Sequence, residues 1–200
     1  MSVKKTASKS ANNPESMDSP ESMNNHKSAG LVFSSRIGNI CLIAEDGKLI
    51  SLRFIGDFPK EGLFCGSDEA SVGCCKAAEL QINEYLEGKR RFFDFPAELR
   101  ATDFTKRVLG EVSLIPYGER APYGFIAERL GIRSPRAVGQ ALKRNPLPLV
   151  IPCHRVVSSA GVGGFTTERG KESSLSVKRF LLGLESSVRL SSGTDVCPKE

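Results

Sequence analysis

The chain has 200 residues, of which 40% are hydrophobic, a size and composition that fit one globular domain or two small ones. No segment approaches the roughly 18 consecutive apolar residues that a membrane-spanning helix requires, so we expect no membrane partner. The net charge is +5, and residues 101–186 contain 13 Lys and Arg against 7 Asp and Glu. A basic half of this kind fits a phosphate-rich partner, although an ordinary solvated surface is the simpler interpretation.

Both ends of the chain are predicted to be disordered tails. Residues 1–29 are rich in Ser, Asn, Lys and Pro and lack the apolar stretch of a secretory signal, and residues 188–200 form the second tail. Without a signal, we expect the six cysteines to stay reduced, in the cytoplasm of a prokaryote or the nucleus of a eukaryote. The histidines are His26 and His154, and no Cys-x-x-Cys pair occurs, so neither a metal nor another cofactor is expected.

Residues 30–100 are predicted to form an N-terminal α/β domain. Two apolar runs, residues 40–44 and 49–54, are joined through Asp46-Gly47, which predicts a β-hairpin. Residues 59–68 are expected to form a loop.

A helix is predicted next, over Glu69–Glu87. Its apolar residues recur at steps of three and four, and Gly88 supplies a stop signal. Residues 91–95 alternate between polar and apolar types, which favours a last strand, and residues 99–102 are expected to link the two domains.

Residues 101–187 are predicted to form a second, mainly helical domain. The expected helices are Thr102 to about Leu114, Tyr123–Leu130 and Pro135 to about Arg144. Ser134 is a good N-cap, and proline suits the first helical position. The short Gly-containing connection between the second and third helices is typical of a DNA-binding helix-turn-helix, and equally of an ordinary pair of antiparallel helices. Basic residues on or beside the third helix are Arg133, Arg136, Lys143 and Arg144.

The segment that follows leads two prolines and an apolar run directly into Cys153-His154-Arg155. Proline fixes φ, so this segment is expected to be stiff. A thiolate is the reactive form of cysteine, and a nearby imidazole or guanidinium favours it. Cys153 is therefore a candidate nucleophile. The alternative is a buried packing cysteine, because neighbours on an extended segment point in opposite directions.

The run Arg144–Val157, which contains Ile-Pro-Cys-His-Arg-Val, resembles the signature of the O6-alkylguanine-DNA alkyltransferases, also called methylated-DNA–protein-cysteine methyltransferases. Residues 87–95, 115–119 and 135–142 match the same family in the same order, and the resemblance spans residues 31–186. It implies an α/β (α+β) fold: a small antiparallel sheet with a helix, similar to ribonuclease H, then an all-helical winged or helix-turn-helix DNA-binding domain.

The resemblance also implies a reaction, the direct reversal of DNA damage. The alkyl group of O6-alkylguanine, with O4-alkylthymine as a further candidate substrate, would pass to Cys153 after the base is flipped out of the duplex. His154 would generate the thiolate through a water molecule, and Glu185 would orient His154. Asn145 would hold the backbone beside the helix-turn-helix. Because the thioether is not regenerated, each molecule would act once.

The implied partner is double-stranded DNA, bound by a monomer through the minor groove. Arg136 matches the arginine that takes the place of the flipped base, and Tyr123 matches the tyrosine linked to phosphate rotation and to protonation of the leaving guanine. Both could instead be plain helix-surface residues. The small Ala137 and Gly139 would let the helix approach DNA closely. The implied substrate pocket consists of Pro148, Val156, Phe165 and Thr166.

Two features depart from the family pattern. Phe165 stands where many relatives carry tyrosine, so it offers no hydroxyl. The polar stretch of residues 166–174 is longer than the usual connection to the last helix and is expected to be an exposed loop.

Three other functions use the same residues. An alkyltransferase-like sensor would bind the lesion without transfer, but such proteins usually lack the cysteine. A Cys-His hydrolase would turn over an acyl substrate and would not need the basic helices. A helix-turn-helix regulator with a redox-sensing Cys153 would require dimerisation, for which the sequence gives no signal.

Overall fold

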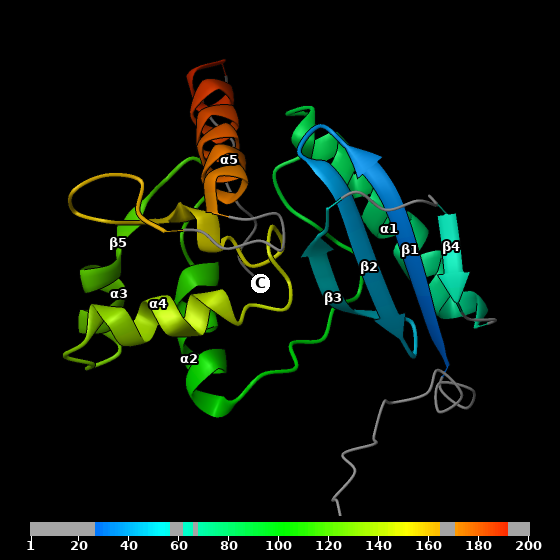
Figure 1. The fold of residues 1–200 in the computed structure, drawn as a ribbon, viewed down its shortest axis with the longest axis horizontal. Helices are drawn as coiled ribbons and strands as arrows, with labels where there is room; N and C mark the ends of the chain where they lie inside the picture. The colour runs from blue at the N-terminus through cyan, green and yellow to red at the C-terminus, as the bar shows by residue number, and fades with distance from the viewer. Residues whose placement is uncertain (1–26, 57–61, 66–67, 165–170, 192–200) are drawn as a thin grey trace, which may run out of the picture.

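The computed structural model describes residues 27–56, 62–65, 68–164 and 171–191, and it divides into a sheet layer and a helical layer (Figure 1). The mixed α/β class expected from the sequence is confirmed. Within the described ranges, no helix combines the length and the apolar character needed to cross a bilayer.

The sheet layer has four antiparallel strands in the order β3-β2-β1-β4. The strands are β1 (Ser28–Ser35), β2 (Gly38–Glu45), β3 (Lys48–Phe54) and β4 (Gly62–Cys65). The predicted hairpin is confirmed: Asp46 and Gly47 both adopt positive φ, 48° and 73°, as a tight two-residue hairpin turn requires. The first strand begins inside the segment that was expected to be a tail.

Two strand predictions are wrong. Strand β4 lies within residues 59–68, where a loop was expected, because a four-residue edge strand beside glycine carries too little pattern to detect. Residues 91–95 form no strand. Their alternation reflects burial against the core instead, since Phe95 is buried and Phe93 packs on Phe95 and on Tyr85.

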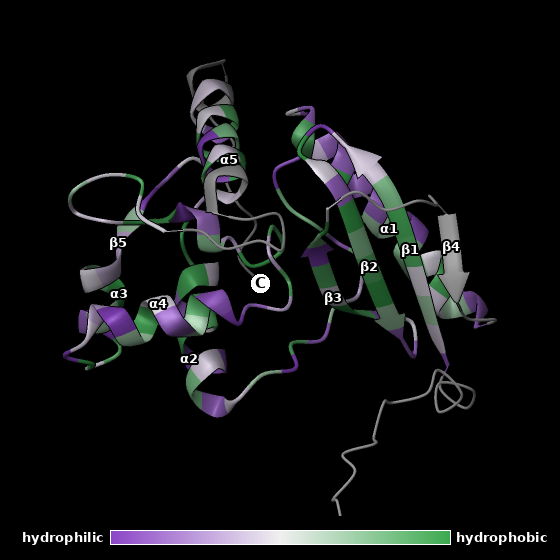
Figure 2. Ribbon diagram, viewed as in Figure 1, coloured by the Kyte–Doolittle hydropathy of each residue, from purple (hydrophilic) through white to green (hydrophobic). Residues whose placement is uncertain are grey.

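Helix α1 (Glu69–Leu86) packs against the sheet, mainly on β1, β2 and β3. Asp68 caps its N-terminus by accepting a hydrogen bond from Ser71 N, and Gly88 follows its end with φ 77°. The predicted helix is confirmed to within one residue. Cys75, Ala78, Ile82 and Leu86 of this helix share the core with the strands, whose apolar residues are green in Figure 2.

The helical layer contains α2 (Asp103–Ser113), α3 (Tyr123–Arg129), α4 (Pro135–Lys143) and α5 (Lys171–Ser191). The three helices predicted before the cysteine are confirmed to within about one residue at each end. Thr102 and Ser134 cap α2 and α4, respectively. Gly131, with φ 67°, makes the turn between α3 and α4.

The prediction that the second half is all helical is wrong. Strands β5 (Ala121–Pro122) and β6 (Val156–Val157) pair in parallel, and a short 3-10 helix, η2 (Cys153–Arg155), precedes β6. Two-residue strands leave no periodicity to read. Their pairing connects the segment that precedes α3 with the segment that follows η2.

One hydrophobic core joins the two layers. Besides the sheet and α1, it contains Leu147, Leu149, Val177 and Leu181 from the second half. The amide of Leu52 in β3 also donates to Pro146 O at 2.8 Å. A second core lies among α2, α3 and α4. The segment around Cys153 is therefore supported from the sheet side, while the division into two domains near residues 99–102 stays a prediction.

We expect Leu181→Ala to lower the free energy of unfolding by about 2–5 kcal/mol, because the side chain is fully buried in the shared core. Urea denaturation would measure the change. Leu80→Ala on α1 is the matched control, since Leu80 is 61% exposed and should change stability by no more than about 0.5 kcal/mol. Equal costs for the two substitutions would contradict the assignment of Leu181 to a shared core.

Candidate active site

The segment between α4 and η2 is held in shape by the side chain of Asn145. Its Nδ2 donates to Ile151 O at 3.0 Å, and its Oδ1 accepts from Leu147 N at 3.0 Å. Leu149 adopts a positive φ of 73°, which non-glycine residues rarely do. These bonds fix an irregular loop whose end presents Cys153.

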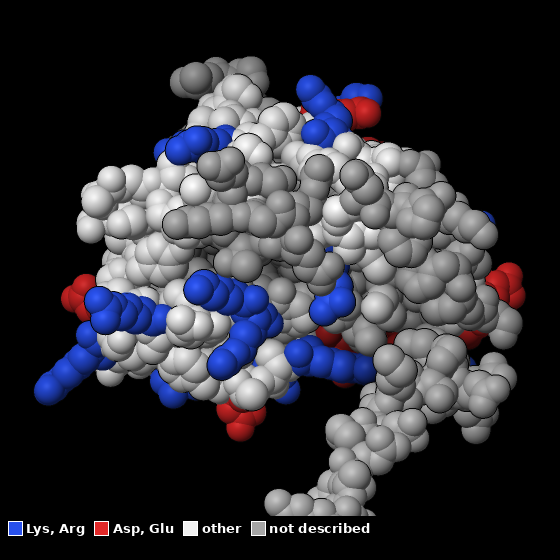
Figure 3. All heavy atoms as spheres, in the orientation of Figure 1, with Lys and Arg blue, Asp and Glu red and all other residues white. Residues whose placement is uncertain are grey.

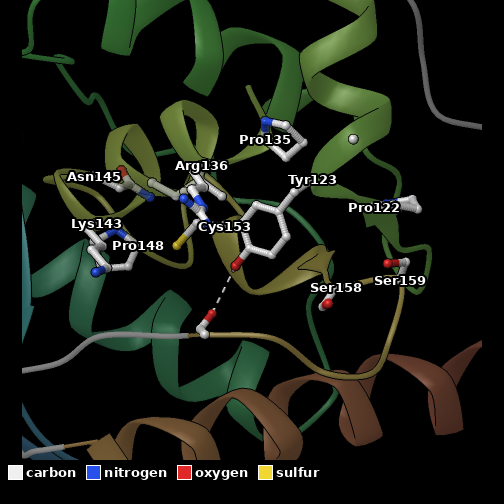
Figure 4. A pocket seen from close by; sticks show the side chains of 14 residues that line it. Pro122, Tyr123, Pro135, Arg136, Lys143, Asn145, Pro148, Cys153, Ser158 and Ser159 are labelled. Atoms are coloured by element: carbon white, nitrogen blue, oxygen red, sulfur yellow. Dashed lines mark hydrogen bonds between the residues drawn. The ribbon is translucent and has the colours of Figure 1, made fainter. Parts of the chain in front are cut away.

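Cys153 lies at a cavity of about 480 Å³ (Figure 4). Six of the residues predicted from the sequence line this cavity: Tyr123, Arg136, Gly139, Asn145, Pro148 and Cys153. Figure 4 shows Tyr123, Arg136 and Cys153 directed toward one another around the cavity. The structure thus brings together candidates from α3, α4 and the loop that precedes η2.

Four of the predicted residues that the structure describes lie outside the cavity lining. His154 and Glu185 are buried next to it. Ala137 is partly exposed in the first turn of α4, and Val156 is fully buried in the second core. Phe165, Thr166 and most of the polar 166–174 stretch lie outside the described residues. The sequence did not single out several residues that do line the cavity, among them Pro122, Leu142, Lys143, Ser158 and Ser159.

Cys153 is buried, with only 7% of the residue exposed. Burial raises its pKa above the ordinary value, although a hydrogen bond from Asn145 and the charge of Lys178 act in the opposite direction. Cys153 is therefore mainly a thiol at neutral pH. To act as a nucleophile it requires a proton acceptor.

His154 is suited to accept a proton. The imidazole is fully buried, and its Nε2 lies 2.9 Å from Oε1 of Glu185. Because the carboxylate is an acceptor, Nε2 carries the proton in the neutral ring, and Nδ1 keeps its lone pair. Nδ1 has no hydrogen-bond partner among the described residues. Burial lowers the pKa of His154, which leaves the ring neutral near pH 7, while Glu185 opposes the shift.

Glu185 is almost fully buried and is surrounded by donors. Arg155 donates to both oxygens through Nε and to Oε1 through Nη2 at 2.9 Å, and Gly118 N donates to Oε2 at 3.0 Å. The hydroxyl of Tyr85 donates to Oε1. Burial alone would raise the pKa of Glu185, but the hydrogen bonds from His154 and Arg155 outweigh it and lower the pKa to about 2. The carboxylate therefore stays ionised at physiological pH.

A buried lysine on α5, Lys178, was not expected from the sequence. Its Nζ donates to Val156 O at 2.6 Å and to Gly164 O at 3.1 Å, and it lies 5.9 Å from the centre of the Tyr123 ring. Burial lowers its pKa to about 8. Lys178 thus joins β6 to the Gly164 segment on one side of the cavity. Lysine is usually exposed to solvent, so no local pattern indicated that this one is buried.

Basic side chains gather on the face that carries α3 and α4 (Figure 3). The cavity opens beside this face, since Pro135, Arg136, Gly139 and Lys143 of α4 line it. Arg136 is exposed, as are Arg133 and Arg144 nearby. An anionic polymer that approaches α4 therefore reaches the cavity that ends at Cys153.

Comparisons with known proteins agree with this arrangement. Residues 103–187 match the family described as "6-O-methylguanine DNA methyltransferase, DNA binding domain". The methylated-DNA–protein-cysteine methyltransferase of Archaeoglobus fulgidus is 50% identical over 156 residues, which cover 77% of this chain and 98% of that one. The crystal structure of the Mycobacterium tuberculosis O6-methylguanine methyltransferase aligns with a TM-score of 0.68 at 32% identity, over 84% of this chain and 96% of that one. A structure of the same bacterium's protein in complex with DNA aligns with a TM-score of 0.63 at 34% identity, over 78% and 92% of the two chains.

The cavity that contains the buried Cys153 lies beside a basic pair of helices, and these helices belong to the matched DNA-binding domain. The chain is therefore in the class of DNA-binding proteins that carry a reactive thiol. Half of all aligned positions are identical to a relative that the chain covers almost completely. The chain belongs to the methylated-DNA–protein-cysteine methyltransferase family.

We expect stability to fall as the pH drops below about 6.5, the ordinary pKa of histidine. The unfolded chain then binds a proton that the buried, neutral His154 does not, so the folded state loses at most about 1.4 kcal/mol per pH unit from this group. Urea denaturation between about pH 7 and pH 5 would measure the slope. His154→Gln should flatten it by this amount. The same slope in both proteins would show that His154 titrates normally in the folded state.

Proposed function

We propose that this protein repairs DNA by direct damage reversal, with Cys153 as the acceptor of the alkyl group from O6-alkylguanine and from O4-alkylthymine. The observation that carries the proposal is the cavity at which a buried thiol, a tyrosine of α3 and an arginine of α4 converge. A cavity of about 480 Å³ has room for a nucleobase that has left the duplex.

The proposed reaction is a single displacement. The sulfur of Cys153 forms a bond to the alkyl carbon while the bond from that carbon to O6 breaks, and the guanine leaves as a repaired base. The proton of the thiol passes through a water molecule to Nδ1 of His154, which is unpartnered among the described residues and belongs to a neutral ring. Tyr123 protonates the leaving guanine and regains a proton from solvent, while His154 later releases the thiol proton to solvent, so the two transfers balance. The thioether is stable, so each molecule reacts once.

Glu185 supports this reaction from behind the imidazole. Its contact with Nε2 leaves Nδ1 as the free acceptor, and its negative charge favours the imidazolium that forms. Asn145 holds the loop that presents the thiol and lowers the thiol's pKa through a hydrogen bond. Each of these side chains therefore has a distinct role in activating Cys153.

DNA is proposed to lie along α4 with its minor groove. Arg136 enters the duplex in place of the flipped base. The small side chains of Ala137 and Gly139 allow α4 to approach the DNA closely. A Cβ at Gly139 would lie 3.8 Å from the Tyr123 ring, so the two helices are already close there. Pro148, Val156, Phe165 and Thr166 are proposed to complete the pocket for the base.

We further propose that residues 30–100 form a ribonuclease H-like domain and residues 101–187 a winged helix-turn-helix domain, acting as a monomer. The cellular location follows from the substrate: the cytoplasm of a prokaryote or the nucleus of a eukaryote.

Incubation with a duplex that contains one O6-methylguanine should add a single methyl group to the peptide that contains Cys153, as measured by peptide mass. Cys153→Ser should abolish the gain. The half-buried Cys41 on β2 is the matched control, and Cys41→Ser should transfer normally. Binding of the lesion without any gain in mass would instead identify a sensor, and repeated turnover of an acyl substrate would identify a hydrolase.

Arg136→Ala should slow transfer from duplex DNA by about 10-fold to 100-fold. The variant lacks the side chain that occupies the position of the flipped base in the stacked duplex, and such a contact contributes about 1–3 kcal/mol. Single-turnover kinetics on the same duplex would measure it. Lys76→Ala removes the same charge from an exposed position on α1 and should have little effect. Equal rates for the two variants would remove Arg136 from the proposed mechanism.

A further inference from the structure

We infer that Tyr85, a residue of the sheet layer, is a positioning residue for the proposed proton acceptor His154 and acts on it through Glu185. The inference rests on the proposed function. It assigns to helix α1, which is remote in sequence from the cysteine, a direct part in setting the reactivity of the site.

The geometry around the hydroxyl of Tyr85 is specific. The hydroxyl donates to Glu185 Oε1 at 2.5 Å and lies 3.3 Å from His154 Nε2. The same Oε1 lies 2.9 Å from that Nε2. The phenol oxygen, the carboxylate oxygen and the imidazole nitrogen therefore form one closed triangle. All three side chains are at least 99% buried, so no solvent water competes for these bonds.

The single proton of the hydroxyl decides what Tyr85 can do. A phenol has one hydrogen, which is directed at Glu185, and its lone pairs then face the N–H of His154. The pKa of Tyr85 is raised well above its ordinary value by burial first and by the charge of Glu185 second, so the phenol stays neutral and remains a donor. It thus stabilises the carboxylate and helps to keep the Nε2–H tautomer in place.

Several other ionisable groups also influence the pKa values of the three side chains in this triangle. Arg155 contacts Glu185 from η2, and Lys178 lies on α5 near the cavity. Tyr117 packs edge-on against Tyr85 with ring centres 6.0 Å apart. The titratable and charged groups that face the triangle are Tyr117, Cys153, Arg155 and Lys178, with Arg91 behind the ring of Tyr117. None of these charges changes when only the hydroxyl of Tyr85 is removed.

Removal of that hydroxyl should change the proton affinity of His154 in a predictable direction. The carboxylate of Glu185 loses a donor, so more of its negative charge acts on His154 and the proton affinity of the imidazole rises. A protonated imidazole cannot accept the thiol proton. The rate of alkyl transfer should therefore begin to fall at a higher pH than in the wild type. The hydroxyl also helps to hold Glu185 and the Nε2–H tautomer of His154 in place, and the loss of this positioning should slow transfer by about tenfold at neutral pH even though the imidazole is a stronger base.

The matched control is the neighbouring tyrosine. The hydroxyl of Tyr117 is buried and has no hydrogen-bond partner among the described residues. Tyr117→Phe therefore removes the same atom at nearly the same place without removing a bond to the triangle. If Tyr85 serves only to fill space, the two phenylalanine variants should behave alike.

The experiment measures single-turnover methyl transfer from an O6-methylguanine duplex to the Cys153 peptide across a series of pH values. It compares the wild type with Tyr85→Phe, Tyr117→Phe, Glu185→Gln and the double variant Tyr85→Phe/Glu185→Gln. We expect a shift of the acid limb to higher pH in Tyr85→Phe and none in Tyr117→Phe. In the Glu185→Gln background, the loss of the Tyr85 hydroxyl should change the rate less than twofold, because the negative charge on which the hydroxyl acts is gone.

Other results would overturn the inference. A Tyr85→Phe protein with the wild-type rate and pH profile would reduce Tyr85 to packing, and a full tenfold loss in the Glu185→Gln background would show that it does not act through the carboxylate. If the wild type gains no methyl group at Cys153, the proposed function fails first, and the two failures are thus distinguishable.

A second measurement keeps the test valid if Tyr85→Phe does not fold. Site-specific fluorotyrosine at position 85 keeps both ring and hydroxyl but makes the phenol a stronger donor. It should draw charge from Glu185 and move the acid limb to lower pH, opposite to the effect of phenylalanine. An unmoved limb would overturn the inference.

Discussion

A carboxylate that has no contact with solvent must be surrounded by donors, because an unpaired buried charge costs several kcal/mol. Glu185 is such a group, and much of the structure near the cavity is arranged around it. Its donors come from α1 (Tyr85), the turn after α2 (Gly118) and η2 (His154 and Arg155), while Glu185 itself lies on α5. Segments separated by as much as 100 residues in the chain are therefore held in one arrangement by a single side chain.

This arrangement divides the site into two sides with different properties. On one side lies a closed network of hydrogen bonds around Glu185, and on the other lies an open cavity bordered by α3 and α4. Cys153 lies between them. The network sets the protonation of His154, and the cavity sets what reaches the sulfur. Because the loop from Asn145 is fixed at both ends, the thiol is presented by rigid backbone rather than by a mobile segment.

Much of the fold and part of the site could be predicted from the sequence. The hairpin at Asp46-Gly47, α1 and the capped helices α2 and α4 follow from strong local signals. The strand at 62–65 and the β5–β6 pair do not, because two to four residues carry no period. Glu185 and Asn145 entered only through family resemblance.

Tyr85 and Lys178 could not be found from the sequence at all. Tyr85 has the spacing of an ordinary core residue in α1, and nothing local indicates that its hydroxyl meets a carboxylate 100 positions later. Lys178 resembles a solvated lysine until the fold surrounds it. In both cases, burial by distant segments gives the side chain its role, and no local pattern records such burial.

The position of Glu185 in the chain has a consequence for the newly made protein. Synthesis proceeds from the N-terminus, so the sheet, α1 and the cysteine all emerge from the ribosome before α5. Until that last helix docks, His154 lacks its carboxylate partner, and the carbonyls of Val156 and Gly164 lack the ammonium of Lys178. A partly synthesised chain therefore carries Cys153 without the groups that activate it. A thiol that can react only once is in this way protected from reaction until the protein is complete.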